Sequence, residues 1–355
     1  MKLGFGLYRH MLNSEHYRFA RQCGATHLVI HLVDYFNKGA KASDQPVSGG
    51  RGGGWGQAGD PERLWTIDEL AAIQKEAAAE GLEIYAIENF DPAHWHDILL
   101  DGPKRDEQTA HICRLIQNVG AAGIPLIGYN FSLAGVAGRV AGDFARGGAE
   151  SVGMAGNIDS TPIPDGMVWN MIYNPEATGA AHAPATPDML WDRLARFLNE
   201  VLPVAEKAGV RLAAHPDDLP VERLRGQPRL VNQPSLYQKL IDINPSPASA
   251  LEYCLGSLAE MTEGGVYDWT RRYAEAGRIG YIHFRNVRGT VPHYHEVFID
   301  EGDLDMRRIL RILKDSGFDG VLIPDHTPKM SAPGPWHAGM AFAMGYMNAL
   351  LQELT

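Results

Sequence analysis

The feature that most constrains the fold is a unit that recurs along the whole chain. In each unit a short apolar run is followed by a polar turn and a longer segment with apolar residues at helical spacing. The eight runs cover residues 3–8, 26–32, 82–88, 124–131, 210–215, 249–254, 279–284 and 320–326. The helical segments cover residues 14–23, 66–80, 105–121, 187–208, 234–243, 266–276, 303–316 and 337–353. Eight strands that alternate with eight helices predict an α/β fold, a (β/α)8 TIM barrel.

Several units end in the same way, with a helix that closes on a glycine just before the next strand, as in "AAEGLEIYA" and "KAGVRLAAH". Glycine adopts the left-handed conformation that ends a helix and turns the chain back. This regularity predicts a single barrel domain over residues 1–355. Two irregular segments interrupt this pattern: residues 49–61, which read as a flexible loop, and residues 132–186, rich in Gly, Ala and Pro, which are too long for an ordinary connection. Because the second segment is inserted after the fourth strand, we expect it at the C-terminal mouth as a lid or oligomerisation segment.

The net charge and the cysteine content limit which partners and which cellular compartment the sequence favours. A net charge of −11 disfavours nucleic acids and anionic membranes as partners. The N-terminus has no signal-peptide pattern, and no apolar stretch reaches the roughly 18 residues of a membrane span. Three widely separated cysteines do not form the pattern of a secreted disulfide protein. We therefore expect a cytoplasmic protein, a homo-oligomer like many barrels, that acts on a small molecule.

Four metal-ligand side chains end the last four predicted strands. These are His215, Cys254, His283 and Asp325, and His326 follows directly. They lie about one β/α unit apart, so the barrel would bring them together at its C-terminal mouth, where the active sites of such barrels lie. Imidazole, thiolate and carboxylate are all ligands of transition metals. The pattern predicts a divalent metal site, and these ligand types leave Mn²⁺, Zn²⁺, Fe²⁺ and Co²⁺ open.

Further polar side chains occur at or just after the strand ends. We expect them to bind the substrate, and they are Tyr8, Glu88, Asn130, Asp217, Arg285 and Asn286. An arginine beside a metal suits a substrate carboxylate, which it can bind with two parallel hydrogen bonds. Carboxylates can bind sugar hydroxyls or orient the histidine ligands. The alternative is that these residues form salt bridges and turn caps around the mouth.

The motifs at these strand ends resemble those of the mannonate dehydratases, metal-dependent sugar-acid lyases with a xylose-isomerase-like TIM barrel. They are "HPDD" at 215–218, "CLGSL" at 254–258, "HFRNV" at 283–287 and "PDH" at 324–326. The resemblance extends over most of the chain. It implies Mn²⁺ held by the four strand-end ligands and His326 as a catalytic acid/base. It also implies loss of water from D-mannonate or a related sugar acid, which gives a 2-keto-3-deoxy sugar acid.

The chain departs from the family pattern at several places. Where the family has "PGYG", with a tyrosine that takes part in catalysis, this chain has "SAPGPWHAG", and we predict His337 as the second catalytic residue. Where the family has "TFCTGS", this chain has "EYCLGS" at 252–257. These departures leave two alternatives open. One is a metal-dependent isomerase, epimerase or β-eliminating lyase that acts on a different sugar or keto-sugar, and the other is a non-catalytic sugar-acid-binding paralogue.

Overall fold

Eight parallel strands form a closed barrel in the computed structural model, which describes residues 1–39 and 54–354. Around the barrel the strands are β1 (Lys2–Leu7), β2 (His27–Ile30), β3 (Glu83–Glu88), β4 (Leu126–Tyr129), β9 (Arg211–Ala214), β12 (Ser249–Cys254), β13 (Ile279–His283) and β16 (Val321–Ile323). Hydrogen bonds between β1 and β16 close the ring. The predicted TIM barrel is therefore confirmed, and each of the eight predicted runs overlaps one barrel strand.

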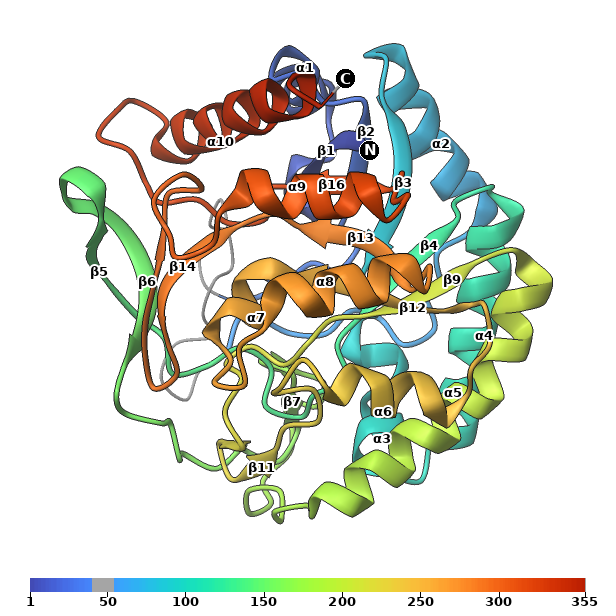
Figure 1. The fold of residues 1–355 in the computed structure, drawn as a ribbon. Helices are drawn as coiled ribbons and strands as arrows, with labels where there is room; N and C mark the ends of the chain where they lie inside the picture. Colours follow the sequence, from blue (N-terminus) through green and yellow to red (C-terminus); the bar gives the residue numbers. More distant parts are fainter. Residues whose placement is uncertain (40–53, 355) are drawn as a thin grey trace.

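Helices surround the barrel (Figure 1). They are α1 (Ser14–Gln22), α2 (Ile67–Ala79), α4 (Arg105–Ala121), α5 (Pro187–Ala208), α6 (Leu236–Ile243), α8 (Val266–Glu275), α9 (Met306–Asp315) and α10 (Pro335–Gln352). Local sequence sets their ends: the Thr186 hydroxyl accepts a hydrogen bond from Met189 N at the start of α5, and Gly209, with φ of 69°, ends it. In the part of the chain that the structure describes, no helix is long and apolar enough to cross a membrane.

The inside of the barrel changes from apolar to polar toward the C-terminal ends of the strands. Its apolar layer contains small residues such as Ala86, Ala213 and Ala250. Further along the same strands, Glu88 and Glu252 are buried and face each other near His283. A buried carboxylate is costly unless it is hydrogen-bonded or paired. The interior therefore ends in a charged layer directly beneath the mouth.

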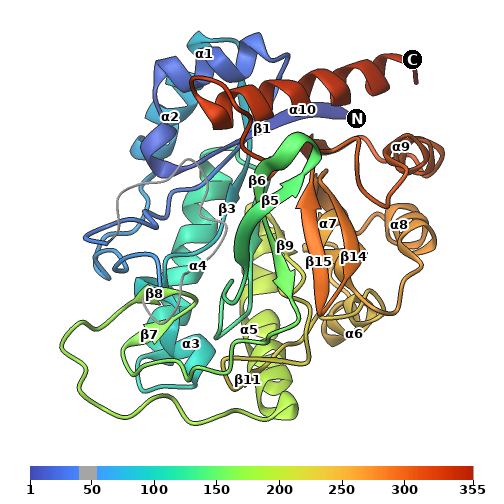
Figure 2. The ribbon, with the colours of Figure 1, turned by 90° about the vertical axis from the view of Figure 1, so that its left-hand side faces the viewer.

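A four-stranded antiparallel sheet lies across one side of the barrel mouth (Figure 2). Its order is β14 (Asn286–Thr290), β15 (His293–Val297), β6 (Ala149–Ala155) and β5 (Val140–Ala145). The segment 132–186 that follows the fourth barrel strand supplies β5 and β6, and it pairs with the hairpin that follows β13. This pairing brings Arg139 and Glu296 to the end of the barrel.

The other elements are short connections. They are η1 (Arg9–Met11), η2 (Pro92–His94), α3 (His96–Leu100), η3 (Arg146–Gly148), β7 (Met167–Val168), β8 (Met171–Ile172), β10 (Arg223–Leu224), β11 (Gln227–Pro228) and α7 (Leu255–Glu260). Helix α7 begins directly after β12, and the Cys254 sulfur accepts a hydrogen bond from Ser257 N at its start. The first turn of α7 therefore fixes the direction of this thiol.

Candidate metal centre and active site

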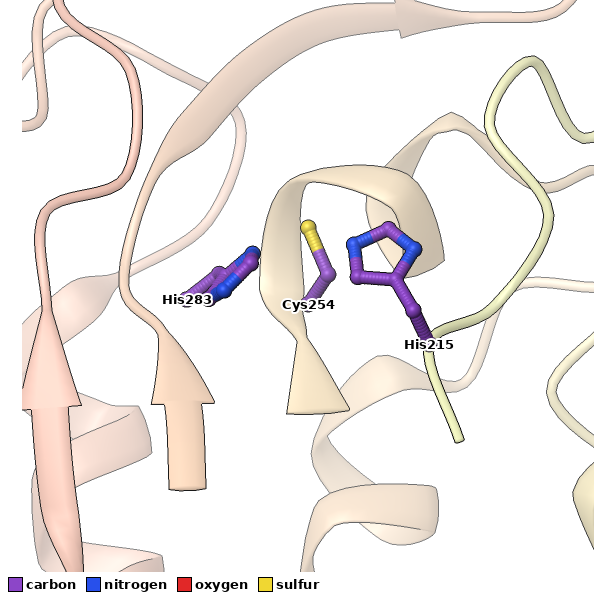
Figure 3. Close-up of side chains that lie close together, drawn as sticks. All are labelled: His215, Cys254 and His283. Atoms are coloured by element: carbon purple, nitrogen blue, oxygen red, sulfur yellow. The ribbon is translucent and has the colours of Figure 1, made fainter. Parts of the chain in front are cut away.

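Three neighbouring strand ends bring two imidazoles and a thiol together. His215 follows β9, Cys254 ends β12 and His283 ends β13, and one ligand atom of each lies within 4.8 Å of the others. Figure 3 shows the Cys254 side chain between the two imidazole rings. Parallel strands that end at the same level of a barrel produce this convergence.

Hydrogen bonds to the outer side of each ring fix which nitrogen faces the cluster. His215 Nδ1 donates to Pro216 O at 2.6 Å, which leaves Nε2 facing the cluster. His283 Nε2 lies 3.2 Å from Glu252 Oε1 and 3.3 Å from Glu88 Oε2, so this nitrogen carries a hydrogen. His283 Nδ1 then faces the other donor atoms, with Asp325 Oδ2 3.3 Å away. Metal-ligating histidines are commonly oriented in this way.

A carboxylate completes the donor set. Asp325, two residues after β16, places Oδ2 3.3 Å from His283 Nδ1 and 3.1 Å from Arg285 Nε. Asp325 adopts φ of 61°, a left-handed conformation that is uncommon outside glycine and costs energy unless surrounding contacts hold it. Its ion pairs with His283 and Arg285 supply such contacts.

The electrostatics favour the ligand form of the thiol and the carboxylate. Burial opposes ionisation of Cys254, but the charge of Arg285 and hydrogen bonds with the two histidines lower the pKa of the thiol well below its usual value. In the same way, burial would raise the pKa of Asp325, yet His283 and His326 lower it far more. Thiolate and carboxylate are the forms that bind metals.

The donor set and the orphaned nitrogen together fit a divalent metal. Two imidazole lone pairs, a thiolate and a carboxylate are ligands of transition metals. His283 Nδ1 is buried without a well-formed hydrogen bond among the described residues, and Asp325 Oδ2 lies 3.3 Å from it, so a cation held by both atoms would satisfy both.

A small cavity of about 80 Å³ lies over this cluster. The predicted site residues in its wall are Tyr8, Glu88, Asn130, His215, His283, Asp325 and His326. His326 Nδ1 lies 3.2 Å from Glu296 Oε2, and its Nε2 lies 3.6 Å from Asp325 Oδ1. This places an imidazole with carboxylate partners at the cavity wall, beside the metal-ligand cluster, where it can exchange protons with a bound molecule.

Arg285 lies outside the cavity wall, where it is buried and forms ion pairs with several acidic side chains. Its Nη2 donates to Asp218 Oδ2 at 2.6 Å and its Nη1 to Glu260 Oε1 at 3.0 Å. Its Nε is bonded to Asp325. The prediction that Arg285 binds the substrate is therefore not supported by its position, because the guanidinium is already engaged in holding acidic side chains around the site.

Two other predicted substrate-binding residues also hold the backbone of loops. Asn286 donates to Ile299 O at 3.1 Å and to Leu304 O at 3.0 Å. Asp217 accepts hydrogen bonds from Leu230 N and Val231 N. Neither residue belongs to the cavity wall. Their positions favour the alternative reading of turn caps around the mouth.

His337 lies away from the cluster. It is in the first turn of α10, and its ring contacts Phe19 and Trp336, with ring centroids 4.8 and 4.9 Å apart. The cavity wall does not include it. This placement does not favour the predicted catalytic role of His337: Pro335 begins a helix here, and the helix directs His337 against α1.

Several residues of the cavity wall are not among the site residues predicted from the sequence. They are His31, Tyr35, Trp55, Asn89, Val136, Arg139, Trp169, Asp218 and Glu252. His31 directly follows β2, and the strand-end argument could have identified it within the run 26–32. Arg139 had no such signal, because it precedes β5 in the inserted segment. It is the one lysine or arginine that the described residues place in the cavity wall, and it pairs with Asp218 and, at 3.1 Å, with Glu296.

The comparisons with known proteins agree on one family. A sequence model described as D-mannonate dehydratase matches residues 41–147 and 180–354. The mannonate dehydratase of Streptococcus equi subsp. zooepidemicus is 30% identical over 315 residues, which are 82% of this chain and 84% of that protein. The mannonate dehydratase of Streptococcus suis is 29% identical over 317 residues, with coverage of 82% and 83%.

Solved structures show the same fold. The crystal structure of mannonate dehydratase from Streptococcus suis serotype 2 matches with a TM-score of 0.75 at 24% identity and covers 99% of this chain and 93% of that chain. A 3-keto-D-glucoside 4-epimerase from E. coli matches with a TM-score of 0.56 at 11% identity and covers 99% of both chains. Since proteins named for different reactions share this barrel, the fold alone does not determine the chemistry.

Proposed function

Because the chain belongs to the D-mannonate dehydratase family, we propose that it is a hydro-lyase that removes water from D-mannonate or a closely related sugar acid. The proton leaves the carbon next to the carboxylate, and the hydroxyl leaves the following carbon. The product is a 2-keto-3-deoxy sugar acid. The observation that carries the proposal is the convergence of His215, Cys254 and His283 at one end of the barrel.

We propose Mn²⁺ as the resident ion, with Zn²⁺, Fe²⁺ and Co²⁺ as the alternatives that metal analysis would separate. The residues that would hold it are His215, Cys254, His283 and Asp325. When bound, a divalent cation supplies Lewis-acid stabilisation of the negative charge that develops on the substrate's carboxylate. This donor set, with one thiolate among nitrogen and oxygen ligands, supports a transition metal over Ca²⁺ or Mg²⁺, which prefer oxygen.

Residues of the cavity wall support binding of an anionic, hydroxyl-rich substrate. Arg139, which is paired with Asp218 and Glu296, adds positive charge to a cavity wall that is otherwise rich in acidic groups, and this charge favours an anionic substrate. Tyr8, Glu88 and Asn130 offer polar groups for the hydroxyls. Arg139 and Trp169 both come from the inserted segment, which supports the proposal that residues 132–186 act as a lid.

His326 is proposed as the group that transfers a proton to or from the substrate. Its Nδ1 is oriented by Glu296 at 3.2 Å, and its ring borders the cavity beside Asp325. General acid–base catalysis by a positioned imidazole typically contributes about 10²–10⁴-fold to the rate.

The experiment that tests the proposal is product analysis with metal-loaded protein on a panel of aldonates. We expect one aldonate, D-mannonate or a close relative, to lose one water and give a 2-keto-3-deoxy acid. Mass spectrometry and NMR would detect the loss of water. Exchange of a substrate proton with solvent without loss of water would instead favour an isomerase or epimerase. Tight binding without any turnover would favour the non-catalytic paralogue.

A further inference from the structure

The proposed dehydration requires two proton transfers, and His326 supplies only one group for them. One group must take the proton from C2, and another must protonate the hydroxyl that leaves C3. Where the family has its "PGYG" tyrosine, this chain has "SAPGPWHAG", and His337 packs against α1 outside the cavity. The second group must therefore come from another part of the cavity wall.

His31 lies in the wall on the side opposite the metal-ligand cluster. It directly follows β2, and in the closed ring β2 stands four strands from β12, which carries Cys254. His31 is 6% exposed, and its ring stacks on Tyr8, with ring centroids 4.6 Å apart. A substrate in the cavity would thus lie between His31 and the cluster.

Two contacts fix the His31 ring and leave one nitrogen for chemistry. Nδ1 lies 2.8 Å from Tyr35 Oη, and that oxygen also accepts a hydrogen bond from Asn89 Nδ2 at 3.0 Å. Nε2 lies 3.7 Å from Glu88 Oε2. When Nδ1 donates to Tyr35, Nε2 has its lone pair and can accept a proton. The nearby carboxylate of Glu88 would stabilise the imidazolium that then forms.

The surroundings also keep the ring in the form that a base requires. Burial, together with the neighbouring His283 and His326, lowers the pKa of His31, while Glu88 and Asp325 oppose this shift. A neutral imidazole in a cavity is able to take a proton at neutral pH. This differs from His326, which has carboxylate oxygens near both ring nitrogens.

We propose that His31 is the second catalytic residue and that its Nε2 removes the C2 proton. This inference rests on the proposed function. The C2–H bond breaks and its proton goes to His31, while its electron pair forms the C2–C3 double bond. The C3–O bond breaks, and the leaving hydroxyl takes a proton from His326 and departs as water. The resulting enol becomes the 2-keto-3-deoxy acid by taking a proton at C3 and losing the proton of its C2 hydroxyl to solvent. Tyr35 is a positioning residue that holds the base.

The test separates the two proton transfers. An aldonate without a C3 hydroxyl cannot lose water, so exchange of its C2 proton in D₂O reports on the base alone. His31→Gln should reduce both this exchange and the dehydration of D-mannonate by about 10²–10⁴-fold, the usual contribution of a general base. His326→Gln should reduce dehydration by a similar factor and keep the exchange. Tyr35→Phe should give an intermediate loss of exchange.

Two controls make the result specific. Metal content is measured in every variant and should stay equal to that of the parent protein. His111→Gln, which changes a half-buried histidine on the outer helix α4, should leave exchange and dehydration unchanged. Added imidazole should restore exchange in His31→Gly, an effect that a merely structural role of His31 would not produce.

The outcomes distinguish this inference from the proposed function. If the parent protein dehydrates D-mannonate and His31→Gln exchanges and dehydrates at the parent rate, the assignment of His31 is wrong and the function stands. If the parent exchanges the C2 proton but never eliminates water, the function is wrong, and the loss of exchange in His31→Gln still supports the base. A parent protein that does neither overturns both.

Discussion

Arg285 Nε donates to Asp325 Oδ2 at 3.1 Å, so a buried guanidinium orients the carboxylate that faces His283. The same guanidinium is bonded to Asp218 and Glu260. Removal of a buried partner leaves uncompensated charges behind, which costs more than the pair itself contributes. Arg285 therefore balances the charge of the buried acidic side chains around the site.

Arg285→Met should destabilise the protein strongly. We expect the free energy of unfolding to fall by about 3–5 kcal/mol, because several buried carboxylates lose their cation. Chemical denaturation checks this value. Arg288→Met is the matched control on the next strand: its ion pair with Glu301 involves a half-exposed arginine, so a change below about 1 kcal/mol is expected. Equal losses in the free energy of unfolding for the two variants would contradict the role of Arg285 in balancing these buried carboxylates.

Glu88 and Glu252 should differ sharply in their effect on metal affinity, although both lie beside His283 Nε2. Burial and the charge of Glu88 raise the pKa of Glu252 well above its usual value, whereas His31 and His283, against burial, lower the pKa of Glu88 to about 2. Glu252 is thus the protonated carboxyl group of this pair. A glutamine side chain, which is also neutral, mimics it.

Titration with Mn²⁺ measures this difference. Glu88→Gln removes the ionised partner of His283 and should weaken metal binding by about 10–100-fold. Glu252→Gln should stay within about threefold of the parent, because it keeps a neutral polar group in place. The reverse order would show that Glu252 carries the negative charge.

His337→Gln should leave catalysis nearly intact. The ring packs against Phe19 and Trp336 outside the cavity, so we expect kcat within about twofold of the parent. Steady-state kinetics on the identified aldonate check this. A loss comparable to that of His326→Gln would return His337 to the catalytic residues.

Metal binding should release protons at neutral pH. Against the effect of burial, a hydrogen bond with Cys254 and the negative charge of its thiolate raise the pKa of His215 to about 9 in the metal-free protein. The ring is then protonated at pH 7 and must lose its proton before it can bind a metal. The apparent affinity should rise by about tenfold per pH unit for each proton released and level off above about pH 9.

Calorimetry in buffers of different ionisation enthalpy measures the number of protons released. At least one proton per metal ion is expected at pH 7. Binding with no proton release, or an affinity that is constant between pH 7 and 9, would contradict the role of His215 as a ligand.

The sequence predicts the barrel well because each of its strands is a local pattern. The regular spacing of the strand ends also predicts that His215, Cys254, His283 and Asp325 lie close together, because barrel geometry turns such spacing into proximity. It could not distinguish a cavity residue from one that holds a loop. Arg285 illustrates this, because its partners Asp218 and Glu260 meet it only in the folded structure.

Two further features could not be predicted because they depend on contacts between distant segments. The sheet over the mouth pairs β6 with β15, which are more than a hundred residues apart, and neither strand has a strong apolar pattern. Arg139 reaches the cavity only through this pairing. His337 is a different case: its place in a motif suggested a catalytic role, but the start of helix α10 directs its side chain against α1.

The most direct test of the account is to incubate D-mannonate with metal-free protein and with the same protein after addition of Mn²⁺. The account predicts that only the metal-loaded protein forms 2-keto-3-deoxy acid, with one water lost per molecule. Metal-loaded protein that leaves D-mannonate and related aldonates unchanged, or metal-free protein that is equally active, would contradict it.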